Sequence, residues 1–397
     1  MLLLGVVSLL TDISSEMLYP IVPLFLTAVL HAPMSVVGLV EGVAEGTASL
    51  LKIASGWISD RIGRRKPLVV WGYGLSAASK PLLALARSWQ AVLLLRFTDR
   101  TGKGLRTAPR DAVIAASCAE DTRGAAFGMH RALDTLGAVI GPAIALVYLR
   151  LLPGAYRPLF VLAAIPAAAG VLLLRPVREP AAGAHKGRSE SVPATGRKGK
   201  SLPVEFRRFT MAYAVFAAGN SSDVFLLLKA RHVGFSESGV LLLYLFYNVV
   251  YALAAGPAGW LSDRLPRVRF FASGLLWFAL VYAGFAFFPQ PAAVWILFAL
   301  YGFYAAATEG VGRACVADFS PPQSRGTAMG IFHTINGLLV LAASIVAGIL
   351  WDRIGPAAAF LYGSACALWS ALWLLRLDTR GQQAPLRAGH RSSRPSG

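Results

Sequence analysis

The sequence predicts an all-α integral membrane protein, with twelve transmembrane helices arranged as two pseudo-symmetric six-helix bundles. Of the 397 residues, 56% are hydrophobic and only 15% are charged, which is more apolar side chain than a soluble core of this length can bury. Apolar runs of about 20 residues recur along the chain, each long enough to cross a hydrocarbon core as a helix. A basic, glycine-containing sequence also occurs twice, about half a chain apart, which indicates an internal repeat.

The expected helices form two sets, separated by a segment rich in Lys, Arg, Gly, Pro and Ser. That composition is typical of a flexible linker. The predicted domains are an N-terminal six-helix half at 1–175, a cytoplasmic basic linker at 176–206, a C-terminal six-helix half at 207–378 and a cytoplasmic tail at 379–397. Helices are expected near 3–30, 36–60, 66–87, 89–113, 124–150, 156–175, 207–230, 237–262, 268–288, 291–316, 325–350 and 354–377.

The repeated sequence is the strongest internal signal. Residues 56–66 read Gly-Trp-Ile-Ser-Asp-Arg-Ile-Gly-Arg-Arg-Lys, and residues 259–267 read Gly-Trp-Leu-Ser-Asp-Arg-Leu-Pro-Arg. Two weaker echoes pair Ser-Ser-Glu at 14–16 with Ser-Ser-Asp at 221–223, and residues 123–128 with residues 325–330. Parallel halves of this kind are typical of transporters whose site lies between them near the membrane midplane.

The formal net charge of +18 does not indicate nucleic-acid binding, because the basic residues lie in short connectors and in the linker. Lys and Arg concentrate in one set of connectors, the linker and the tail, which predicts that both termini and both repeated sequences face the cytoplasm. The amino terminus has no basic region before its apolar run, so we expect a retained first helix rather than a signal peptide. The predicted location is the bacterial inner (cytoplasmic) membrane, as a multi-pass protein.

These residues resemble the major facilitator superfamily across essentially the whole chain. Residues 56–66 are similar to the signature loop of that family between its second and third helices, and residues 259–267 are similar to the weaker second copy. Arg100 to Gly104 resembles the fourth-helix Arg-x-x-x-Gly element. The residues Gly137, Gly141 and Pro142 resemble the fifth-helix Gly-x-x-x-Gly-Pro element of drug and metabolite exporters. The resemblance implies alternating access by rocking of the two halves.

More narrowly, the chain is similar to a bacterial branch that includes nickel-resistance efflux proteins. The resemblance rests on Asp-Ile-Ser-Ser-Glu-Met at 12–17, Glu-Gly-Val-Ala-Glu at 41–45, Asp-Arg-Thr-Gly-Lys-Gly at 99–104 and Ala-Pro-Arg-Asp-Ala at 108–112. Some members of that branch carry a histidine-rich tail, whereas this chain has only His390 there. The resemblance to this branch makes a divalent metal (nickel or cobalt) efflux transporter one alternative function.

A conformational latch is predicted at the repeated sequences. Asp60 falls at a cytoplasmic helix end, where a carboxylate can meet the amino terminus of a partner helix and nearby arginines. The resemblance implies that this partner helix begins near Arg325. The predicted latch residues are Gly56, Asp60, Arg61, Gly63, Arg64, Asp263 and Arg264.

Intramembrane charge concentrates on the predicted fourth helix. Such charges cost on the order of 2.5–3.5 kcal/mol each on insertion scales, so they tend to face the protein interior and to be functional. One helical stripe is predicted, because three- and four-residue steps separate Arg96, Asp99, Arg100, Lys103, Arg106 and Arg110. Acids on neighbouring helices are either structural partners of this stripe or proton carriers. The predicted proton-coupling and charge network is Asp12, Glu16, Glu41, Glu45, Asp99, Arg100, Lys103 and Asp134.

Two questions about this network stay open in the sequence. Glu16, Glu41 and Glu45 are the preferred proton carriers, and Arg100 is either a mechanistic residue or an anchor for an anionic substrate. The acids of the first two helices either consume the positive excess of the stripe or leave it free for substrate. Candidate substrate-cavity residues are Arg96, Arg131, Asn220, Asp223, Tyr247, Glu309 and His333.

The predicted function is a proton-coupled exporter of a small molecule that works by alternating access. The alternatives are the metal efflux transporter named above, an organic-anion importer and a non-transporting membrane sensor. No enzyme activity or cofactor is expected, because Thr-Gly-Lys-Gly at 101–104 lacks the remainder of a phosphate-binding loop. No metal site is expected, because the cysteines lack metal-ligand spacing and the histidines are isolated. The expected partners are a small-molecule or ion substrate, protons and the lipid bilayer, with no nucleic acid, and the protein is expected to be a monomer.

Overall fold

The computed structural model describes residues 2–62, 65–117, 123–176, 203–320 and 325–381. Its regular elements, within these ranges, are α-helices, which confirms the predicted fold class. The N-terminal half contains α1 (Leu2–Leu18), α2 (Ile21–Ala28), α3 (Met34–Ile62), α4 (Lys66–Leu83), α5 (Trp89–Ala116), α6 (Arg123–Leu151) and α7 (Tyr156–Leu172). The C-terminal half contains α8 (Val204–Gly219), α9 (Val224–His232), α10 (Glu237–Arg264), α11 (Arg267–Phe287), α12 (Pro291–Asp318), α13 (Arg325–Arg353) and α14 (Pro356–Gly381).

The first predicted helix of each half is interrupted. The predicted helix 3–30 is divided between α1 and α2 at Tyr19 and Pro20, where the proline lacks a backbone N–H. The predicted helix 207–230 is divided between α8 and α9 at residues 220–223. There the backbone N–H of Ser222 donates to Ser344 Oγ at 3.1 Å, so a side chain replaces a helical hydrogen bond. The continuous helices predicted at both places are therefore wrong, and the two interruptions lie just after Ser-Ser-Glu in the first half and within the matching Ser-Ser-Asp sequence in the second.

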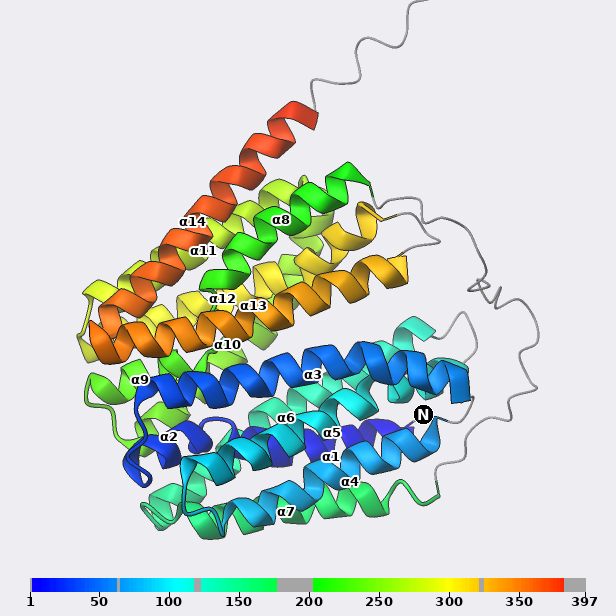
Figure 1. Cartoon of the computed structure of the whole chain (residues 1–397), viewed down its shortest axis with the longest axis vertical. Helices are drawn as coiled ribbons and strands as arrows, with labels where there is room; N and C mark the ends of the chain where they lie inside the picture. Colours follow the sequence, from blue (N-terminus) through cyan, green and yellow to red (C-terminus); the bar gives the residue numbers. More distant parts are fainter. Residues whose placement is uncertain (1, 63–64, 118–122, 177–202, 321–324, 382–397) are drawn as a thin grey trace, which may run out of the picture.

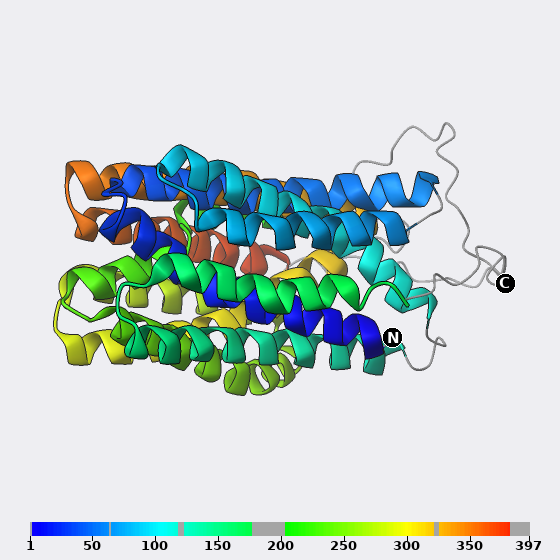
Figure 2. The same cartoon turned by 90° about the horizontal axis from the view of Figure 1, so that it is seen from below.

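Nine helices or helix pairs within the described residues are long and apolar enough to cross a membrane, and α7 is a shorter apolar helix. With the basic helix α5 and the helix α4, these elements are consistent with the predicted count of twelve spans. The protein is therefore a multi-pass membrane protein. Figure 1 shows α1–α7 packed as one bundle and α8–α14 as another, and Figure 2 shows the helices running roughly side by side along one axis.

The two halves meet at the end of the molecule that carries α2 and α9, and their helices spread apart toward the end that carries the amino terminus (Figure 1). At the closed end, α3 and α13 are in backbone contact. A β-carbon added at Gly38 would lie 2.1 Å from the carbonyl oxygen of Ser344, and one at Gly348 would lie 2.4 Å from that of Met34. Only glycine permits so close an approach of two helix backbones.

A carboxylate also joins the halves at this closed end. Asp352, near the last residue of α13, accepts hydrogen bonds from the backbone N–H groups of Met34 at 2.9 Å and Ser35 at 2.8 Å. These are the first residues of α3, whose N–H groups have no partner within their own helix. Tyr156 of α7 donates a further hydrogen bond to Glu237 of α10. The closed end is thus held by side chains that cross between the halves.

Candidate functional site

A buried ion pair joins α3 and α5 inside the N-terminal half. Arg96 Nη2 donates to both carboxylate oxygens of Glu41 at 2.8 Å. Glu41 is fully buried and Arg96 is 3% exposed. Charged groups this deep in a membrane protein need partners, because each one loses its hydration. The sequence did not show which acid pairs with which cation of the stripe. The structure identifies Glu41 as the partner of Arg96.

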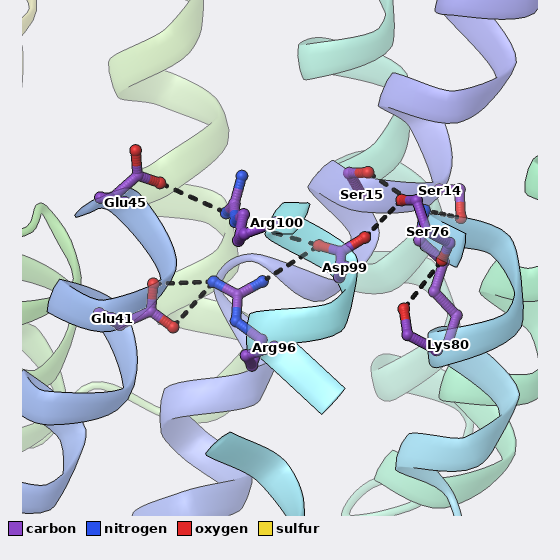
Figure 3. A network of polar contacts seen from close by, with 10 residues as sticks. Ser14, Ser15, Glu41, Glu45, Ser76, Lys80, Arg96, Asp99 and Arg100 are labelled. Atoms are coloured by element: carbon purple, nitrogen blue, oxygen red, sulfur yellow. Dashed lines mark hydrogen bonds and ion pairs between the residues drawn. The ribbon is translucent and has the colours of Figure 1, made fainter. Parts of the chain in front are cut away.

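Arg100 lies one helical turn further along α5 and contacts a second acid of α3. Its Nη2 atom is 3.5 Å from Glu45 Oε1, and its Nε atom is 4.0 Å from Asp99 Oδ2. Asp99 is also 3.9 Å from Arg96 Nη1 and accepts a hydrogen bond from Ser76 of α4. Figure 3 shows these side chains pointing toward one another from α3, α4 and α5. Four residues of the predicted network, Glu41, Glu45, Asp99 and Arg100, therefore form a connected set together with Arg96, which was predicted to line the substrate cavity.

The network has a member on α4 that the sequence analysis missed. Lys80 is 1% exposed, and its Nζ atom donates to Ser14 Oγ at 2.7 Å and Ser15 Oγ at 3.1 Å of α1 (Figure 3). In the sequence, Lys80 is a single charge next to Pro81, inside the helix expected near 66–87. Its position among apolar and small residues on a membrane helix was the sequence feature that could have identified it as a functional residue.

Glycines bring α5 close enough to its neighbours for these contacts. A β-carbon at Gly102 would lie 2.4 Å from the carbonyl oxygen of Gly72 on α4. One at Gly104 would lie 2.5 Å from the β-carbon of Leu51 on α3. Both glycines occur inside the Arg-Thr-Gly-Lys-Gly sequence, so the same segment carries the charges and the small residues that let them pair.

A cavity of about 410 Å³ lies between the two halves, next to this network. Its polar lining comes from both halves, with most of it on the N-terminal side. The lining residues are Asp12 and Glu16 of α1, Lys52 of α3, Lys103, Arg106, Thr107 and Arg110 of α5, Asp134, Thr135 and Ala138 of α6, Asn248 and Tyr251 of α10, and Glu309 of α12. A volume of this size suits a small molecule.

The glycines of the fifth-helix motif pack α6 against the two acids of α1. A β-carbon at Gly137 would lie 2.8 Å from the β-carbon of Asp12. One at Gly141 would lie 2.5 Å from the carbonyl oxygen of Ile13 and 3.0 Å from the β-carbon of Glu16. Pro142 follows inside α6. The motif therefore fixes the helix pair that presents Asp12 and Glu16 to the cavity.

Tyrosines of the C-terminal half contact the cavity acids. Tyr244 of α10 donates to Glu16 Oε2 at 2.8 Å, which joins the two halves. The ring of Tyr244 also stacks on Tyr19, with centroids 5.4 Å apart. Within the C-terminal half, Tyr251 donates to Glu309 Oε2 at 2.8 Å. On the N-terminal side, Asp134 lies 3.3 Å from His130 Nδ1.

The predicted cavity residues are distributed unevenly. Glu309 lines the cavity, whereas Arg96 is committed to Glu41. Asp223 accepts a hydrogen bond from Tyr301 at 2.6 Å beside the interruption between α8 and α9, and Asn220 has a buried Oδ1 without a hydrogen-bond partner there. Tyr247 is packed 5.4 Å from the ring of Tyr301. His333 of α13 is outside the lining, and the side chain of Arg131 lies outside the described residues.

The repeated sequences form matching helix ends. Arg61 lies 5.3 Å from the ring centroid of Trp57 at the end of α3, and Arg264 lies 3.7 Å from that of Trp260 at the end of α10. Gly56 packs at ordinary contact distance against Ala108 of α5. The side chains of Asp60 and Asp263, residues 63–64 and the side chain of Arg325 lie outside the described residues. The latch stays a prediction.

The sequence matches known proteins over nearly its whole length. The model of the Major Facilitator Superfamily matches residues 4–229 and 209–395. The chain belongs to the major facilitator superfamily. It is 38% identical to an uncharacterised MFS-type transporter of Methanocaldococcus jannaschii, over 94% of this chain and 93% of the relative.

Solved structures of superfamily members share the fold. A crystal structure of the nucleoside transporter NupG has a TM-score of 0.78 at 15% identity and covers 95% of this chain and 98% of its own. A peptide transporter POT, crystallised in complex with sulfate, has a TM-score of 0.80 at 15% identity and covers 96% and 94%. At this identity the likeness is one of fold alone. This member of the major facilitator superfamily is thus a membrane transporter with a charged cavity between its halves.

Proposed function

We propose that this superfamily member is a proton-coupled exporter of a small molecule, which works by alternating access. The observation that carries the proposal is the hydrogen bond from Tyr244 to Glu16. It links a cavity carboxylate of one half to the other half, at a place where rocking of the halves must break or remake it. A proton on Glu16 removes its charge and changes its hydrogen-bonding role. Protonation therefore biases the equilibrium between conformations.

The charged surroundings support a role of this carboxylate in coupling. Glu16 and Asp12 line the same cavity as Lys103 and Arg106. Protonation of an acid and binding of a charged substrate therefore each change the electrostatic potential at the other site. Export is supported by the packing of Gly137 and Gly141 against α1, because these glycines belong to the element that resembles exporters. Positive-inside topology supports an inner-membrane location with both termini in the cytoplasm.

Glu16→Gln should abolish substrate-dependent proton movement while leaving downhill substrate exchange in place, because glutamine keeps a hydrogen-bonding group but cannot carry a proton. The measurement uses proteoliposomes containing a pH-sensitive dye, with a substrate found by a resistance and uptake screen over metals and small organic molecules. Glu205→Gln, at an exposed position in the first turn of α8, is the matched control and should behave as wild type. Proton movement that persists in Glu16→Gln would contradict the assignment of Glu16.

A further inference from the structure

The six ionisable residues of the α5 stripe separate into paired and unpaired groups. Arg96 is bound to Glu41, and Arg100 lies between Glu45 and Asp99. Arg110 is paired as well, because its guanidinium donates hydrogen bonds to Asp111 and to Ser8, each at 2.9 Å. Lys103 and Arg106 differ. Across the described residues, no carboxylate oxygen is found within 4.0 Å of either cation.

Both unpaired cations line the cavity, and Lys52 of α3 joins them there. In the part of the chain that the structure describes, Lys52 likewise has no carboxylate oxygen within 4.0 Å. Its ammonium group is repelled by Lys103, Arg100 and Arg313, and only Glu45 of its own helix attracts it among the groups that act most strongly on it. Three cations and their repulsion are costly at this depth unless an opposite charge is present in part of the transport cycle.

Arg106 is the most buried of the three cations. It is 3% exposed, and its Nη1 atom is buried without a hydrogen-bond partner. Its guanidinium lies 4.5 Å from the ring centroid of Tyr73, which holds one face of the group by a cation–π contact. This contact fixes the orientation of the N–H donors, of which the Nη1 group has no hydrogen-bond acceptor. A fixed guanidinium with free donors suits a planar carboxylate or a phosphate.

The cavity acids attract these cations across the cavity but are not in direct contact with them. Glu16 accepts its hydrogen bond from Tyr244, Glu309 from Tyr251, and Asp134 lies against His130. Asp12 lines the cavity as well but forms no ion pair within 4.0 Å of a described cation. The acids and the three cations therefore face the same space without neutralising each other by direct contact.

We propose that the transported molecule carries an anionic group, a carboxylate or a phosphate, and that Lys52, Lys103 and Arg106 bind this group. This inference rests on the proposed transport function and adds the substrate class. Lys52 belongs to α3 and the other two cations to α5, so the anion joins two helices of one half. Thr107 and Asn248 provide polar contacts for the rest of a molecule that fits about 410 Å³.

Ligand-dependent thermal stability of the purified full-length protein tests the proposal. The probes are inorganic phosphate, a phosphate monoester, a monocarboxylate and a dicarboxylate, compared with a quaternary ammonium ion of similar size, all at constant ionic strength. At least one anion should raise the unfolding temperature in a saturable way. Lys103→Gln and Arg106→Gln should each weaken its apparent affinity by about tenfold or more, which is the loss expected for one charge-assisted contact. Arg87→Gln, an exposed position between α4 and α5, should match wild type.

If no anion stabilises the protein, if the quaternary ammonium ion alone does so, or if both cavity variants respond like Arg87→Gln, the anion site is wrong. Lys52→Gln gives a second, less buried position, so the test does not depend on whether Arg106→Gln folds. Binding of an anion without proton movement would keep the substrate class and remove the proton coupling. Proton movement with a cationic substrate would keep the coupling and overturn this inference.

Discussion

Arg96→Gln should lower the free energy of unfolding by about 3–5 kcal/mol, the range expected when one partner of a buried ion pair is removed. The reason is that Glu41 is fully buried and receives two hydrogen bonds from Arg96, so the substitution leaves a carboxylate without its counter-charge. The measurement is denaturant unfolding in detergent micelles. Because Arg87 is exposed, Arg87→Gln should change the same quantity by no more than about 0.5 kcal/mol.

The double variant Glu41→Gln/Arg96→Gln separates pairing from packing. Two neutral amides of similar size remain at the same positions, so most of the lost stability should return. If the double variant is as unstable as the sum of the two single variants, the loss comes from shape rather than from the unpaired charge. That result would contradict the description of this contact as an ion pair that needs both members.

Gly38→Ala should open the closed end of the protein and reduce transport at least about tenfold. Its added methyl group would lie 2.1 Å from the carbonyl oxygen of Ser344 and 2.9 Å from its carbonyl carbon, which are backbone atoms of the other half. Backbone cannot rotate away as a side chain does, so α3 and α13 must separate. Spin labels at Val29 and Ile354, both exposed near this end, should move apart when measured by double electron–electron resonance.

Gly74→Ala is the matched control for this substitution. Gly74 lies in a helix of the same half, and a β-carbon there would have nothing within 4 Å. Its label distance and its transport rate should equal those of wild type. A Gly38→Ala protein whose Val29–Ile354 distance is unchanged would show that the two helices do not need to approach this closely.

The helices and the repeat were predictable because they depend on the sequence locally. Runs of apolar residues are long enough to span a membrane, and the repeated sequence keeps its Gly-Trp-x-Ser-Asp-Arg order in both halves. The interruptions were harder to see. Pro20 was visible, but proline also occurs inside continuous helices such as α5 and α10. At residues 220–223 the bond from Ser222 to Ser344 comes from a distant part of the chain.

The charged stripe was predictable, whereas its pairing was not. Steps of three and four residues place Arg96, Arg100 and Lys103 on one face of a helix whatever surrounds it. Which of them meets Glu41 or Glu45 depends on how α5 is rotated and shifted against α3, and this is determined by close packing at Gly104. Lys80 was missed for a similar reason, since its partners Ser14 and Ser15 lie on another helix.

Alternating access requires that the distances between the halves change in opposite directions at the two ends of the protein. A second label pair at Ile53 of α3 and Ile331 of α13 reports on the end where the halves spread, in protein lacking its three native cysteines. On addition of substrate or a change of pH in lipid nanodiscs, the Ile53–Ile331 distance should shorten while the Val29–Ile354 distance lengthens. If both distances stay constant, or both change in the same direction, the two halves do not rock about the cavity and the protein does not work by alternating access of this kind.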